Sequence, residues 1–191
     1  MPDFGYYQTY LQAGLEEIER YLLSDDLFWS VSVVPSADVS YPNLTLGGLL
    51  LYQVYARVLA ETSSQQVSYQ KLENQLNSLR SHWRVAWERK ATWEFEARLR
   101  QWGNVLKEIR SDPTENVAYY RYEVRIRVLL ALLRHEIPEV DTAYLEHLDN
   151  LDTILQALFE PGDFIWEQGF TSAFPKDVYW YLWGEPREPK F

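Results

Sequence analysis

The chain has 191 residues, 47 % of them hydrophobic and 24 % charged, which is typical of a folded domain and argues against intrinsic disorder. It contains no cysteine, so disulfides, thiolate nucleophiles and cysteine-ligated zinc or iron–sulfur centres are excluded. No stretch approaches roughly 18 uncharged apolar residues, and the first residues lack a basic, apolar leader. We therefore expect a cytoplasmic protein that does not enter a membrane.

The formal net charge of −10 is unevenly distributed along the chain. Residues 71–134 carry 13 basic and 8 acidic side chains, whereas both flanking segments are acidic. Acidic outer segments that pack on a basic centre neutralise it, so the pattern predicts internal ion pairing and makes a nucleic-acid partner unlikely on these grounds. The 8 Trp, 14 Tyr and 8 Phe residues indicate that large rings fill the core or cover an interface.

The first third of the chain predicts two helices joined by an extended segment. Apolar residues at spacings of three and four predict a first helix over residues 4–24. Residues 27–34 alternate partially and contain β-branched side chains, so they form a strand or a packed loop. A second helix is expected from Asn43 or Thr45 to about residues 62–64. Gly47 and Gly48 in its first turn indicate either close helix packing or an anion at the helix N-terminus.

No proline interrupts residues 64–110, which could therefore form one helix of up to 47 residues. Its apolar stripe changes direction, so the helix is expected to kink or to change partner near residues 91–97. A ridge of residues four apart winds between the two faces and could pack into the groove of another helix. The ridge consists of Trp83, Trp87, Ala91, Phe95 and Leu99.

Two more helices are expected, at residues 113–135 and from Pro138 to about residue 160. The second of these has a regular apolar stripe and an acidic outer surface. The last 30 residues are too aromatic to form a free tail, so they are predicted to lie along the bundle as a clasp. The sequence thus predicts an all-α, single-domain bundle of about five helices over residues 1–184, with a short tail at 185–191.

The sequence offers no complete catalytic or metal-binding pattern. The three histidines, His82, His135 and His147, do not form the paired motifs of a di-iron carboxylate bundle. The acidic groups Glu16, Glu17, Glu19, Glu146, Asp149 and Asp152 are interpreted as solvated helix faces and not as Mg²⁺ ligands. No serine lies in a nucleophile-elbow motif. No cofactor or metal is predicted.

Lys90 stands out among the ionisable residues because its position falls within the apolar stripe of the long helix. An ammonium group there is costly unless it is paired, so Lys90 either marks a polar pocket, with Glu94 as a local partner, or lays its stem on tryptophan and extends its charge outward. Aromatic and basic residues near Lys90, together with two tryptophans of the C-terminal segment, complete the set of candidate binding residues. They are Lys90, Trp87, Arg84, Trp83, Trp180 and Trp183.

These observations predict a non-catalytic protein-interaction or scaffold domain whose exposed aromatic surface meets a protein partner or a second copy of the chain. The main alternative is an enzyme or small-molecule-binding protein with an aromatic pocket around Lys90. A weaker alternative is nucleic-acid binding through the basic central helices.

Overall fold

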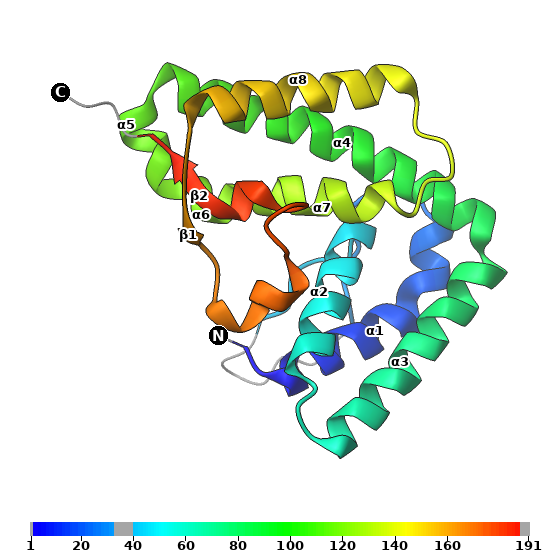
Figure 1. Ribbon diagram of the computed structural model, residues 1–191. Helices are drawn as coiled ribbons and strands as arrows, with labels where there is room; N and C mark the ends of the chain where they lie inside the picture. The colour runs from blue at the N-terminus through cyan, green and yellow to red at the C-terminus, as the bar shows by residue number, and fades with distance from the viewer. Residues whose placement is uncertain (1, 33–39, 188–191) are drawn as a thin grey trace. The chain divides into compact units, whose positions relative to one another are not determined.

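The computed structural model describes residues 2–32 and 40–187, and most of them are helical (Figure 1). The chain divides into two compact units. Unit 1 runs to Glu94 and adds His135–Pro138, and unit 2 comprises Phe95–Arg134 and the residues from Glu139 onward. The predicted helical class is correct, but the prediction of a single bundle of about five helices is wrong: eight α-helices and a two-stranded sheet are found in the described part of the chain.

Unit 1 is built on α1 (Phe4–Leu23), α2 (Leu46–Leu59) and α3 (Ser63–His82), which contact one another. Asp3 caps α1 by accepting a hydrogen bond from the Tyr6 amide, and the predicted apolar face of α1 is buried. Thr45 caps α2 by accepting one from the Gly48 amide over 3.0 Å, which confirms the predicted start of this helix. α2 ends at Leu59, a few residues before the predicted position.

The segment predicted to be extended contributes a single β-bridge, between Trp29 and Leu44. Their backbone groups exchange two hydrogen bonds, of 3.0 and 2.7 Å. Residues 33 and 34 of the predicted segment lie outside the described residues. One isolated bridge does not make a strand, so residues 27–32 form a loop, and none of them is buried.

Tyrosines of α1 and α2 account for much of the aromatic content of unit 1. The Tyr52 ring centroid lies 4.6 Å from that of Tyr10 and 5.1 Å from that of Tyr7, with the rings steeply inclined in both pairs. Such edge-to-face pairs add to the stabilisation from burial alone. In this unit the tyrosines therefore serve chiefly as core.

The long helix predicted over residues 64–110 is interrupted at Trp83, between α3 and α4 (Arg84–Ser111). Trp83 leaves the helical conformation with φ −102° and ψ 27°. The break resets the helical phase, which explains why Trp93 is 37 % exposed although the uninterrupted stripe placed it inside. On α4 the buried residues follow the predicted ridge instead, and the change of partner expected near residues 91–97 coincides with the boundary between the two units.

Unit 2 contains the second part of α4 together with α7 (Arg125–Arg134) and α8 (Thr142–Leu158) (Figure 1). α4 faces α8 at Gly103, where an added Cβ atom would make an ordinary contact of 3.8 Å with the side chain of Leu151. The predicted helix at 113–135 is divided into α5 (Pro113–Asn116), a 3₁₀ turn at Val117–Tyr119, α6 (Tyr120–Glu123) and α7. The last predicted helix begins at Thr142 and not at Pro138, because Asp141 supplies its cap.

The aromatic C-terminal segment forms β1 (Phe159–Phe164), 3₁₀ turns at Gln168–Ala173 and Trp180–Leu182, and β2 (Trp183–Pro186). β1 and β2 pair antiparallel, with Phe159 opposite Pro186 and Glu160 opposite Glu185. The register is interrupted by a bulge between Pro161 and Phe164. Glu185 and Pro186, assigned from sequence to the tail, thus belong to a strand, while residues 188–191 lie outside the described residues.

Candidate functional site

Lys90 is 2 % exposed and is held by the end of α1. Its Nζ donates hydrogen bonds to the carbonyl oxygens of Ser24, at 2.8 Å, and Asp26, at 3.0 Å. The ammonium also lies 4.5 Å from the centroid of the Tyr21 ring and 5.1 Å from that of Trp93. Burial is the main cause that lowers the pKa of Lys90 from its usual value, and the nearby Arg89 charge adds to this effect.

These contacts place a positive charge at the C-terminal end of α1. Carbonyl groups at a helix end have no partner within the helix and carry the negative end of the helix dipole, so a cation there is favourable. The Arg89 guanidinium adds a hydrogen bond of 3.3 Å to the carbonyl oxygen of Leu22. The geometry gives Lys90 a structural role as a cap, with its donors directed at backbone and not at an open cavity.

Glu94, the expected partner of Lys90, is fully buried and bonds to a different helix end. Its Oε2 accepts a hydrogen bond of 2.9 Å from the amide of Gly47 in the first turn of α2. An anion does occupy this helix N-terminus, and it is a carboxylate of the chain itself. The Gly47 and Gly48 pair thus combines the two interpretations that the sequence left open.

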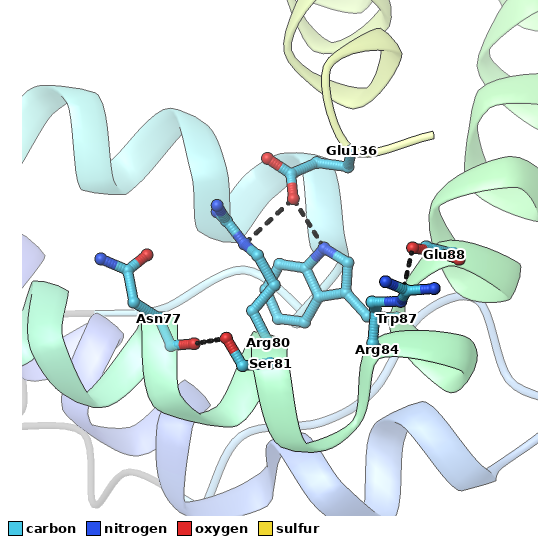
Figure 2. Close-up of polar contacts among 7 residues, drawn as sticks. All are labelled: Asn77, Arg80, Ser81, Arg84, Trp87, Glu88 and Glu136. Atoms are coloured by element: carbon cyan, nitrogen blue, oxygen red, sulfur yellow. Dashed lines mark hydrogen bonds and ion pairs between the residues drawn. The ribbon is translucent and has the colours of Figure 1, made fainter. Parts of the chain in front are cut away.

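Trp87 and Arg84, two further predicted binding residues, make separate contacts (Figure 2). Trp87 is buried, and its Nε1 donates to Glu136 Oε2 over 2.8 Å. Arg80 Nε lies 3.1 Å from the same oxygen, as an ion pair without the alignment of a hydrogen bond. Figure 2 shows Arg80 and Trp87 converging on Glu136, whereas the exposed Arg84 pairs with Glu88 at 3.4 Å.

Trp83 is the half-buried residue at the helix break, with its ring 5.2 Å from that of His82. Lys90, Trp87, Arg84 and Trp83 therefore have four different sets of contacts. The structure does not bring them together in one pocket of the described chain. The break separates Trp83 from the other three residues, which all lie on α4.

Trp180 and Trp183 pack within the C-terminal segment of unit 2. The Trp180 ring lies 5.2 Å from that of Phe159, edge to face. Trp183 Nε1 donates to the carbonyl oxygen of Phe174 over 3.0 Å, and the Lys176 ammonium lies 5.7 Å from its ring centroid. Both indoles are half-buried. Among the eight tryptophans only Trp93 reaches the exposed class, so the expected exposed aromatic surface is not formed by these residues.

A partly buried ion pair links α7, α8 and the C-terminal segment in unit 2. Arg127 binds Asp152 through two hydrogen bonds, from Nε at 2.8 Å and from a terminal nitrogen at 2.7 Å. The guanidinium carbon lies 4.6 Å from the centroid of the Tyr181 ring. Asp152 was expected on a solvated face; the pair instead realises the internal neutralisation predicted between the basic middle and the acidic end of the chain.

An open groove of about 800 Å³ runs along the two strands of unit 2. We call it the β1–β2 groove; it is lined by Val117 and by residues 160–165 and 184–187. Gly184 makes the close approach of the strands possible, since at φ +140° an added Cβ would overlap the carbonyl oxygen of Glu160. The buried rings of Phe159 and Phe164 hold β1 at its two ends.

The lining of the β1–β2 groove is acidic. Glu160, Asp163 and Glu185 are exposed, and none of them has an ion-pair partner among the residues that the structure describes. Arg187 is the single cation of the lining. These residues could not be predicted as a site, because Pro161-Gly162 indicates only the end of a helix and no sequence pattern brings residues 160–165 to residues 184–187.

The histidines belong to no cluster of possible metal ligands among the described residues. His82, His135 and His147 are exposed, and no group of three or more His, Asp or Glu residues that could hold a metal ion is found among residues 2–32 and 40–187. In that same part of the chain, no helix has the length and apolar character needed to cross a bilayer. No family model, curated protein or solved structure matches the chain.

Proposed function

We propose that this protein is a non-catalytic protein-interaction domain that docks a partner in the β1–β2 groove. The observation that carries the proposal is the groove itself, about 800 Å³ in volume and bordered by strands that each pair on one side only within the described sheet. Strands with an unpaired edge are the usual acceptors of an extended partner segment. The buried aromatic rings of Phe159 and Phe164 anchor β1, one of the two strands of the groove.

The alternative of a small-molecule or enzyme pocket around Lys90 has less support. The Lys90 donors are directed at the carbonyl oxygens of Ser24 and Asp26, and two rings cover the ammonium. Nucleic-acid binding also has less support, because Arg80 and Arg127 from the basic middle of the chain pair with carboxylates from its acidic end. A scaffold that pairs with a second copy of itself remains within the proposal as one kind of protein partner.

The test uses a chain that has no cysteine of its own, so an introduced cysteine is its only thiol. A library of displayed peptides is selected on the wild-type protein. Selected peptides are then measured against Asp163→Cys carrying a bulky maleimide in the groove. The matched control is Asp149→Cys with the same label, at an exposed position on α8 outside the groove.

We expect peptides that bind the wild type and the labelled Asp149→Cys protein but not the labelled Asp163→Cys protein. The proposal is wrong if no peptide is enriched, or if the enriched peptides bind both labelled proteins equally. Far-UV circular dichroism of the two labelled proteins checks that each retains the helical fold, so that lost binding is attributable to the blocked groove.

A further inference from the structure

Two carboxylates face each other across the two strands that line the groove. Glu160 and Glu185 are register partners in the antiparallel pair, and both are exposed. Side chains directly opposite in such a pair lie on the same face with their Cβ atoms about 5 Å apart. Like charges in this arrangement destabilise a sheet, so the position is an unusual one for two glutamates.

Nothing described in the structure neutralises this pair. Neither glutamate has an ion-pair partner among the described residues, and Arg187, the single cation of the lining, has none either. Asp163 adds a third carboxylate on the bulged part of β1. Two partly buried ion pairs among the described residues, at Glu136 and Asp152, show that this fold does pair carboxylates with arginine elsewhere.

The backbone of the groove is also short of hydrogen-bond donors. Pro161 and Pro186 both lie in the paired strands and have no N–H group. The lining therefore presents carbonyl and carboxylate acceptors in excess of donors. Lysine and arginine side chains are donors without acceptor groups, and they complement such a lining in both charge and hydrogen bonding.

We propose that the β1–β2 groove binds an extended, lysine- or arginine-containing segment of a partner protein, with one cationic side chain held between Glu160 and Glu185. The proposal rests on the proposed function and specifies the chemistry of the partner. The facing glutamates then serve recognition: they repel each other in the free protein, and a bound cationic side chain relieves this repulsion.

The experiment compares three labelled peptides of about eight residues by fluorescence anisotropy at low salt. They share one alternating sequence and differ only in carrying two lysines, two glutamines or two glutamates. The protein is the wild type, the groove variant Glu160→Gln/Glu185→Gln, or the control variant Glu139→Gln/Glu146→Gln. The control removes the same charge from exposed positions of unit 2 outside the groove.

We expect the lysine peptide to bind the wild type and the control variant about equally, and the groove variant at least ~10-fold more weakly. Binding to the wild type should weaken as salt is raised, because exposed charges are screened. The groove variant should also melt slightly higher, on the order of 1–2 °C, since the repulsion between the two strands is gone. A purely structural role for the glutamates predicts no such opposition between stability and binding.

The proposal is overturned if the lysine peptide binds the groove variant and the control variant equally, which would indicate general attraction to an acidic protein. It is also overturned if Ca²⁺ alone saturates the site, or if the wild type forms a dimer that the groove variant does not. Binding of the glutamine peptide in the groove with the same affinity as the lysine peptide would contradict this inference while leaving the proposed function intact. Failure of the displayed-peptide selection would contradict both the proposed function and this inference.

Discussion

Two buried tyrosines of unit 2 provide a matched test of how hydrogen bonding contributes to this fold. The Tyr120 hydroxyl donates to the carbonyl oxygen of Tyr181 over 2.7 Å. The Tyr181 hydroxyl, in contrast, is buried without a hydrogen-bond partner in the described chain. Both side chains are fully buried, so replacing either with Phe removes one oxygen atom and leaves the ring in place.

The two substitutions should change stability in opposite directions. Tyr181→Phe removes a hydroxyl whose burial without a partner costs about 1–3 kcal/mol, so we expect the free energy of unfolding to rise by about 1 kcal/mol. Tyr120→Phe loses a hydrogen bond and leaves a buried carbonyl oxygen without this partner, so we expect the free energy of unfolding to fall by about 1–2 kcal/mol. For a chain of this size, 1 kcal/mol corresponds to about 2–4 °C in Tm.

The difference in the free energy of unfolding between Tyr181→Phe and the wild type should also depend on pH. Burial raises the pKa of the Tyr181 phenol above its usual value of 10.0. Above pH 10 the unfolded chain therefore loses this proton while the folded chain keeps it, and the contribution to stability falls as pH rises toward the folded pKa. Tyr181→Phe lacks this titration, so its stability advantage over the wild type should grow between pH 8 and pH 10.5.

Urea unfolding followed by circular dichroism gives the free energy of unfolding of the three proteins, and equal m values establish that the compared transitions are equivalent. The reasoning is refuted if Tyr181→Phe is destabilised as much as Tyr120→Phe. That result would mean that the Tyr181 hydroxyl is satisfied, for instance by an internal water that bridges it to another polar group.

Three further predictions concern contacts that stabilise one unit or the other from within. Lys90→Met removes both hydrogen bonds to the end of α1 and should lower the free energy of unfolding by about 2 kcal/mol; an unchanged urea midpoint would contradict the capping role. Gly184→Ala should lower the free energy of unfolding by at least ~2 kcal/mol and increase amide hydrogen exchange in β1 and β2. The control Gly169→Ala should leave the stability nearly unchanged, because the space around Gly169 is open. Similar melting curves for the two variants would show that the close contact of the strands at Gly184 does not require glycine. Asp152→Asn should lower the free energy of unfolding by about 3 kcal/mol, because it leaves the Arg127 charge unpaired. In a double-mutant cycle, the double variant with Arg127→Met should lose much less stability than the sum of the two single variants. Strictly additive losses would argue against direct coupling of the two side chains.

The sequence predicted the local structure of unit 1 well where capping and periodicity agree. The apolar spacing of α1 and the threonine before α2 specify these helices through contacts within a few residues, and both are found as expected. The charge segregation likewise predicted internal pairing, which Arg80–Glu136 and Arg127–Asp152 provide.

The break at Trp83 could not be derived from the sequence, because no proline or glycine marks it. A single non-helical residue separates Trp83 from the helical phase of α4, whereas Lys90 and Trp93 both lie on α4 and remain in contact. The sequence left open whether Lys90 marks a polar pocket or extends its charge outward. Lys90 is in fact buried, and its partners are backbone carbonyl groups, which no side-chain pattern reveals.

Amino-acid order by itself determined the helical class and the absence of thiol chemistry, since these follow from composition and from spacings of three and four residues. Only the tertiary structure decided which carboxylates are neutralised and which face one another. Glu160 and Glu185 are 25 positions apart along the chain, and their juxtaposition arises from a strand register that long-range pairing alone can set.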